Sequence, residues 1–255
     1  MIGQSIATCE FTAFRWLQQF WGIADINIRQ RWNIAWPHLS ILPLTGVKLL
    51  DAGCGVGLWS LEIAARRPGW KITGIDRDAD SLRVAERARS LLNLDNVSFE
   101  SADLLQFQTK EAFDVVLSVE SAHYLAQAGL GRELFQKYAQ WLTSNGALMM
   151  LASRSQSEVP LWRGLPNPML HSVFFGNQIE ELCEAAGLTV ERLQPELGSL
   201  ATAAKQVSVA ARGSIITRAI AYPIEVLLCL ADSLPLVDKG KRSNSWCLIA
   251  RMKQE

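Results

Sequence analysis

Apolar residues along the chain follow two alternating patterns, short continuous runs and longer stretches with helical spacing. The short runs have the length of buried strands, and the stretches between them place their apolar residues on one side of a helix. The predicted strands are 47–51, 70–76, 96–101, 113–120, 147–152, 188–193 and 245–252, and the predicted helices are 58–67, 79–92, 132–142 and 177–186. This alternation predicts an α/β fold with helices on both faces of a mostly parallel sheet.

Residues 1–40 precede this alternation and are rich in aromatic side chains. Helical spacing of Phe14, Leu17 and Trp21 predicts a helical extension that either caps a site or packs on the sheet or another subunit. Arg29, Arg31 and Trp32 are candidates for contacting an anionic or planar group, although a solvated helix face is favoured for the two arginines. Pro43 and Gly46 mark residues 37–46 as a connector.

Two later segments do not fit the strand and helix alternation. Residues 153–175 lack a clear period and predict a loop that shapes a pocket, with side chains available from Trp162, Arg163, Met169, His171 and Phe175. Residues 197–238 form a predicted helical insertion interrupted by Pro223. Its apolar face is interpreted as ordinary packing, as a wall for a lipid-like or aromatic substrate, or as a homodimer surface.

The segment between the first strand and the first helix reads Asp51-Ala-Gly53-Cys54-Gly55-Val-Gly57. Glycines at alternate positions allow the backbone to approach a ligand closely, and the following helix start offers free N–H groups. A dinucleotide fingerprint needs its third glycine one residue later, where this chain has Leu58. The spacing therefore disfavours a nicotinamide-dependent oxidoreductase, which stays the less favoured alternative.

The sequence D-x-G-x-G-x-G resembles motif I of class I S-adenosylmethionine (SAM) methyltransferases. Phe113-Asp114-Val-Val116 resembles motif IV of the same family, and Glu184-Ala-Ala-Gly-Leu-Thr-Val190 resembles its helix-to-strand junction. The resemblance implies a Rossmann-like, seven-stranded, mostly parallel sheet with an antiparallel last strand over residues 41–255. The nearest similarity is to small-molecule enzymes of ubiquinone and menaquinone biosynthesis.

The same resemblance implies a set of cofactor-binding residues at successive strand ends. Asp76 ends the second strand, where a carboxylate accepts hydrogen bonds from ribose hydroxyls. Asp103 follows the third strand, where the family binds the adenine edge. The expected SAM-binding residues are Asp51, Gly53, Cys54, Gly55, Gly57, Asp76, Arg77, Asp103, Leu104 and Glu120. Asp78 is expected to cap the next helix and Asp114 to serve a structural role at the strand entrance.

Methyl transfer to a hydroxyl or an acidic carbon is assisted by a base. His123 is the first candidate because an imidazole titrates near neutral pH, and Tyr124 and His171 are alternatives. Both His123 and Tyr124 follow the fourth strand, where open parallel sheets bind ligands. A SAM-binding protein without catalysis, such as a regulator, is a further alternative.

Composition and charge narrow the choice of partners. Lys and Arg total 25, as do Asp and Glu, so the formal charge of zero gives no reason to expect nucleic acid. We find no Asn-Pro-Pro-Tyr-like motif after the fourth strand, which disfavours DNA and protein acceptors. The 5 cysteines are scattered and no signal peptide or membrane-length apolar run is visible, so we expect no metal site, no membrane span and a cytoplasmic protein.

Overall fold

The computed structural model describes residues 26–153, 174, 176–196 and 245–253, with single positions between 200 and 231. Its strands are β1 (Thr45–Ala52), β2 (Gly69–Asp76), β3 (Val97–Ser101), β4 (Phe113–Val119), β5 (Leu142–Ser153), β6 (Leu188–Glu196) and β7 (Ser245–Met252). They form one seven-stranded sheet in the order β3-β2-β1-β4-β5-β7-β6. Neighbours from β3 to β5 are parallel, while β7 runs antiparallel to β5 and β6. The expected fold class is confirmed.

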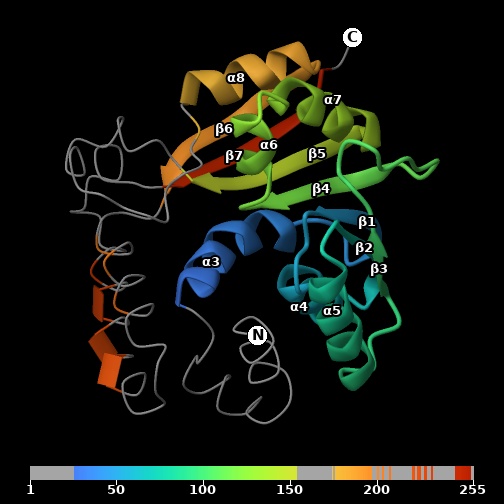
Figure 1. Cartoon of the computed structure of the whole chain (residues 1–255), viewed down its shortest axis with the longest axis vertical. Coiled ribbons are helices and arrows are strands. Elements are labelled where there is room, and N and C mark those ends of the chain that lie inside the picture. The colour runs from blue at the N-terminus through green and yellow to red at the C-terminus, as the bar shows by residue number, and fades with distance from the viewer. Residues whose placement is uncertain are drawn as a thin grey trace.

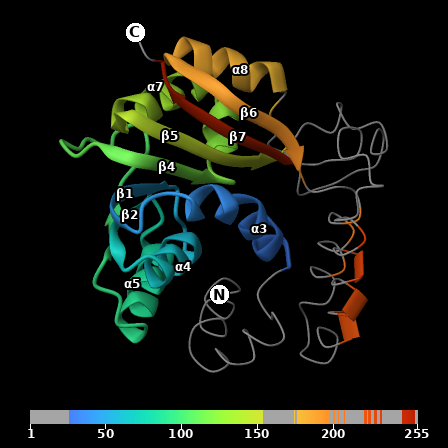
Figure 2. The same ribbon diagram turned by 180° about the vertical axis from the view of Figure 1, so that it is seen from behind.

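Helices cover both faces of this sheet, as Figures 1 and 2 show from opposite sides. The described helices are α3 (Ile26–Ser40), α4 (Leu58–Arg66), α5 (Ala79–Leu91), α6 (Ala122–Gln127), α7 (Gly131–Trp141) and α8 (Gly176–Ala185). Residues of α3, α4 and α5 share one hydrophobic cluster with the sheet, and residues of α6, α7 and α8 share the other. The molecule therefore has two apolar layers separated by the strands.

Adjacent residues of the central strands face opposite layers. In β1, Leu49 belongs to the cluster with α3 and α4, whereas Leu50 belongs to the cluster with α7. In β4, Val115 and Val116 divide in the same way. Successive side chains of a strand point to opposite sides, so a strand buried on both faces needs a continuous apolar run. The apolar runs seen in the sequence arise from this double burial.

The carboxyl ends of β1 and β4 lie side by side at the centre of the sheet, where Asp51 pairs in register with Leu117. From β1 the chain continues into α4 on one face, and from β4 it continues into α6 and α7 on the other. Ligands of open α/β sheets bind where successive connections diverge to opposite faces. The fold thus places the glycine turn next to residues 120–124.

Two predicted boundaries are wrong. The expected connector at residues 37–46 begins later, because α3 continues through Pro37 to Ser40. Burial of Ala35 and Leu39 offsets the backbone hydrogen bond that proline removes. The strand expected over 147–152 begins earlier, because β5 starts at Leu142, and its register against β4 shifts between Phe113 and Val115.

The described positions of the 197–238 segment include an exposed apolar stripe. The exposed side chains are Ile220, Ile224 and Leu227, whereas Ala221 is buried. The homodimer surface and the substrate wall both stay predictions for this stripe. Among the described residues, no helix has the length and apolar character that a membrane crossing requires.

Candidate functional site

The glycine turn after β1 depends on a left-handed backbone at each of its glycines. The φ angles are 83° at Gly53, 54° at Gly55 and 76° at Gly57, a region that residues with a Cβ rarely occupy. The amides of Gly53 and Cys54 both donate to the carbonyl oxygen of Ile75, at 2.8 and 3.0 Å. The turn is therefore attached to the end of β2.

The three glycines have different surroundings. A Cβ on Gly53 would lie 2.4 Å from Cβ of Ser121, and a Cβ on Gly57 would lie 2.7 Å from the Phe99 ring. A Cβ on Gly55 would meet nothing within 4 Å. Gly53 and Gly57 are thus required by packing inside the protein, and Gly55 is the position where a ligand can approach the backbone.

The start of α4 and the end of β2 border this open position. Gly57, the N-cap residue of α4, provides no side-chain hydrogen bond to the helix start. One carboxylate oxygen of Asp76 accepts from the amide of Gly55 at 2.8 Å, and the other accepts from the amide of Asp78 at 2.9 Å. These bonds hold a negative charge beside the open glycine, and each oxygen keeps further capacity to accept a ligand hydroxyl.

Asp76 and the residues after β3 lie at adjacent strand ends, because the amide of Ala102 donates to the carbonyl oxygen of Asp76 at 2.9 Å. The Asp103 carboxylate accepts from the amide of Leu105 at 2.9 Å, which fixes the short turn after the strand. Leu104 packs against the hydrophobic cluster, and the side chain of Arg77 is exposed. Roles in cofactor binding for these residues stay predictions.

Asp51 is the most deeply buried acid of the predicted set. Its carboxylate accepts from the Ser60 hydroxyl at 2.6 Å, at the first turn of α4. Burial raises the pKa of Asp51 to about 6, against the opposing effect of the hydrogen bonds from Ser60. Burial also raises the pKa of the Cys54 thiol, with the carboxylates of Asp51 and Asp76 adding to the shift. Cys54 is therefore a protonated, buried side chain beneath the turn.

Two expected structural roles are confirmed. The Asp78 carboxylate accepts from the amide of Asp80 and caps α5. The Asp114 carboxylate accepts from the amide of Lys48 at 2.9 Å and joins the start of β4 to β1.

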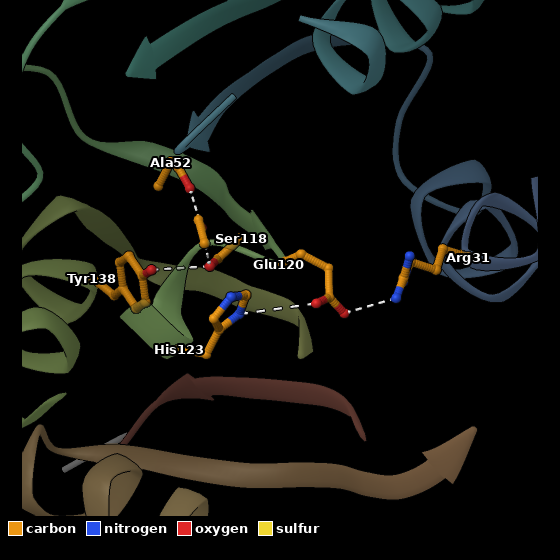
Figure 3. A network of polar contacts seen from close by, with 7 residues as sticks. Arg31, Ala52, Ser118, Glu120, His123 and Tyr138 are labelled. Carbon is orange, nitrogen blue, oxygen red and sulfur yellow. Dashed lines mark hydrogen bonds and ion pairs between the residues drawn. The ribbon is translucent and has the colours of Figure 1, made fainter. Parts of the chain in front are cut away.

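A chain of hydroxyl groups links α7, the end of β4 and the glycine turn (Figure 3). The Tyr138 hydroxyl donates to Ser118 at 2.9 Å, the hydroxyls of Ser118 and Ser121 lie 2.9 Å apart, and Ser121 donates to the carbonyl oxygen of Ala52 at 2.7 Å. Burial raises the pKa of Tyr138 beyond its usual range, so this phenol stays a donor. The chain fixes the segment after β4 against the turn after β1.

Glu120 lies between an arginine of α3 and the candidate base, as Figure 3 shows. Arg31 Nη2 donates to Glu120 Oε1 at 3.0 Å, and Glu120 Oε2 lies 3.9 Å from Nδ1 of His123. His123 is buried, and the centre of its ring lies 4.1 Å from the centre of the Tyr124 ring. Tyr124 is exposed. The two candidate catalytic side chains are therefore neighbours with opposite access to solvent.

The expectation of a solvated face for Arg31 is wrong. Its side chain is 12% exposed, and its partner Glu120 lies 89 positions away in the sequence, so only tertiary structure brings them together. Trp32 stacks on Trp36 and contacts Trp59 of α4, so it joins two helices. The side chain of Arg29, and residues 162, 163, 169, 171 and 175 of the predicted loop, lie outside the described part of the chain.

Sequence reasoning missed two members of this site, Ser60 and Tyr138, whose hydrogen bonds depend on burial. Arg31 was a candidate for contacting an anionic group, but its partner Glu120 was not predicted. No local sequence pattern indicates these partners. In the described part of the chain, no three His, Cys, Asp or Glu side chains gather as metal ligands.

Comparison with known proteins places these observations in a family. A family model described as a methyltransferase domain matches residues 44–212. The ribosomal RNA small subunit methyltransferase G of Methylobacillus flagellatus is 30% identical over 111 residues, covering 43% of this chain and 54% of that protein. The ubiquinone biosynthesis O-methyltransferase of Rhodopseudomonas palustris is 32% identical over 99 residues, covering 36% of each.

Among solved structures, coclaurine N-methyltransferase bound to N-methylheliamine and SAH superimposes with a TM-score of 0.61 at 15% identity. That match covers 88% of this chain and 72% of the other. The chain spans between 27% and 64% of the length of the first curated relatives it matches. The names of these proteins refer to ribosomal RNA, to ubiquinone biosynthesis and to coclaurine.

Proposed function

This chain belongs to the methyltransferase domain family, and on that basis we propose that it binds S-adenosyl-L-methionine and methylates a small-molecule or lipid-like acceptor. The observation that carries the cofactor assignment is the open backbone at Gly55, with φ 54° and nothing within 4 Å of a Cβ placed there. The carboxylate of Asp76 hydrogen bonds the same residue. A nucleoside ligand with a flexible amino-acid tail fits these neighbours.

The residues proposed to hold the cofactor come from three strand ends. The open backbone at Gly55 and the amides at the start of α4 meet the amino-acid part, the carboxylate of Asp76 accepts from the ribose hydroxyls, and Asp103 borders the adenine. When bound, SAM supplies a methyl group already activated on a positive sulfur. The protein must then align the acceptor and exclude water, since proximity and orientation account for much of such catalysis.

On the acceptor side we assign His123 as the base and Tyr124 as its neighbour that meets the acceptor. His123 is buried beside the carboxyl end of β4, and Tyr124 is exposed where an acceptor can reach it. The neutral formal charge of the chain supports a small or lipid-like acceptor over nucleic acid. The described cysteines 54, 183 and 247 are free, which supports a cytoplasmic location.

Calorimetry tests the cofactor assignment directly. Purified protein is titrated with SAM, with its product S-adenosylhomocysteine (SAH) and with NAD. Binding of both sulfur nucleosides without NAD binding supports the assignment, and uptake of NAD alone would overturn it. Incubation with methyl-labelled SAM and a cell extract then identifies the molecule that gains the label. SAM binding without any labelled product would favour a non-catalytic regulator.

The role of His123 is tested by His123→Ala, with His38→Ala as a control that removes a histidine from the last turn of α3. We expect His123→Ala to lower turnover about 100-fold, as the loss of a general base does, while SAH affinity stays within about two-fold. Loss of SAH binding by a folded His123→Ala protein would contradict the assignment.

A further inference from the structure

We propose that Arg31 is a positioning residue for the acceptor side of the site. Through Glu120, α3 fixes the segment that carries His123, so this helix is a working part of the site as well as a cover. The inference rests on the proposed function, because it assigns His123 to the acceptor step. It moves Glu120 from the cofactor set, where the sequence placed it, to the acceptor side.

The Arg31–Glu120 pair has the properties of a structural clamp. Arg31 Nη2 and Glu120 Oε1 are 3.0 Å apart, with side-chain exposures of 12% and 25%. A charge-assisted hydrogen bond with this little solvent is stronger than the exposed ion pairs elsewhere on the surface. Figure 3 shows Glu120 placed between Arg31 and His123, with one carboxylate oxygen directed to each.

The backbone of Glu120 is strained in a way that needs such support. Its φ is 53°, a left-handed conformation that costs a residue with a Cβ about 1 kcal/mol. Strain of this kind persists where several contacts determine the conformation together, and it concentrates at functional sites. Here the amide of Glu120 donates to the carbonyl oxygen of Leu151 at 2.8 Å, and the adjacent Ser121 is bonded to Ala52. Arg31 supplies the support on the side of α3.

The helix that carries Arg31 is itself firmly attached. Trp32 and Trp36 stack with ring centres 5.0 Å apart, and the guanidinium group of Arg66 lies 5.3 Å from the centre of each ring. Ala35 and Leu39 are buried against the sheet. A guanidinium over indole rings adds a cation–π attraction to this packing. Arg31 therefore reaches Glu120 from a rigid support.

Glu120 lies beside the candidate base, at the end of β4. At the glycine turn, the carboxylate that contacts Gly55 is that of Asp76. The second oxygen of Glu120 instead lies 3.9 Å from His123 Nδ1. At 3.9 Å this contact is longer than a hydrogen bond, so the Glu120 carboxylate acts on the imidazole through its charge and its place beside the ring. Removing the Arg31 charge releases this carboxylate, and a small misplacement of a catalytic group lowers turnover strongly.

The test compares Arg31→Met, which keeps a long side chain without charge, with Arg31→Lys, which restores the charge. Arg83→Met is the matched control, because Arg83 pairs with Asp80 on the exposed surface of α5. Three readouts apply to each variant: SAH affinity by calorimetry, the imidazole NMR signals of labelled histidine, and turnover with the acceptor identified by labelling. The chain has 3 histidines, so His123→Gln assigns the relevant signal.

We expect Arg31→Met to shift the His123 signal and to lower turnover about 10-fold to 100-fold, with SAH affinity within about two-fold of the parent. Arg31→Lys is expected to recover most of the turnover and of the parent position of the His123 signal. Arg83→Met is expected to change neither the turnover nor that signal. An unshifted His123 signal in folded Arg31→Met, or an equal loss of SAH affinity and turnover, would overturn the proposal. If the parent protein failed to bind SAH, the proposed function would fall, while the histidine spectra would still decide whether Arg31 positions His123.

Discussion

The hydroxyl of Ser121 donates a 2.7 Å hydrogen bond to the carbonyl oxygen of Ala52, which joins the segment after β4 to the turn after β1. The Cβ of Ser121 lies only 2.4 Å from the place where a side chain on Gly53 would begin. The first glycine of the turn is thus required by this contact as well as by its φ of 83°. The glycine turn at residues 53–57 and the proposed acceptor-side segment at residues 120–124 are therefore held together directly.

Gly53→Ala is expected to destabilise the fold by about 3 kcal/mol, combining left-handed strain with overpacking against Ser121. Gly129→Ala is the control, since Gly129 has a φ of 79° but nothing within 4 Å, and about 1 kcal/mol is expected there. Urea unfolding measures both. Ser121→Gly added to Gly53→Ala should recover part of the loss, and no recovery would show that the clash is not the cause.

Gly55→Ala is expected to weaken ligand binding without a large loss of stability. The new methyl group meets no protein atom within 4 Å, so the stability loss should match the loss of about 1 kcal/mol expected for Gly129→Ala. SAH affinity should fall at least about ten-fold, because the methyl group occupies the ligand's side of the backbone. Calorimetry measures the SAH affinity of both variants. Unchanged affinity in Gly55→Ala would show that the ligand does not bind against the backbone at Gly55.

Asp51 predicts a specific dependence of stability on pH. Its pKa is raised from 3.8 to about 6 in the folded protein, so the folded state holds the proton more tightly than the unfolded chain. The stability this gives is fully present below about pH 4 and is lost as pH rises through about 6, amounting to up to about 3 kcal/mol.

Asp51→Asn should therefore flatten this part of the profile. The amide still accepts from Ser60 and carries no charge, so the variant is expected to be more stable than the parent at pH 7.5. Near pH 4 the two should be similar. Urea midpoints measured across this range test the sign, and a parent that gains stability relative to Asp51→Asn as pH rises would contradict it.

Substitutions of the neighbouring acids Asp76 and Asp78 test ligand binding against helix capping. Asp76→Ala removes the acceptor of the Gly55 amide and the proposed ribose partner, so SAH affinity should fall about 100-fold, the effect of losing two good hydrogen bonds. Asp78→Ala removes a helix cap and should cost about 1 kcal/mol of stability. Its SAH affinity should stay close to that of the parent. Equal SAH affinities in Asp76→Ala and Asp78→Ala would show that Asp76 does not contact the ligand.

The order and type of the elements after residue 45 were predictable because each central strand is buried on both faces. That burial demands apolar runs such as Leu49–Leu50 and Val115–Leu117, and the glycines of the turn interrupt them visibly. The family expected from D-x-G-x-G-x-G is the one whose model matches residues 44–212, so that prediction is confirmed. Local patterns were sufficient for these features.

The side-chain partners in the site could not be predicted from the sequence. The Arg31–Glu120 bond spans 89 positions, and an arginine in a polar helical segment has the same local pattern whether it is solvated or buried. The different surroundings of Gly53, Gly55 and Gly57 also depend on which neighbour lies above each glycine. The helical course of α3 through Pro37 was missed because burial of its last turn outweighs a local breaker.

The pairing of the last described strand has a consequence for biosynthesis. β7 lies between β5 and β6, and β6 pairs with the sheet through β7. While a ribosome is still making residues before 245, β5 has an open apolar edge and β6 has no template to join. The five strands from β3 to β5 can pair early, but completion of the sheet must wait until those late residues leave the exit tunnel. In that interval the unpaired edge of β5 is open to pairing with another chain, the hazard of any exposed strand edge.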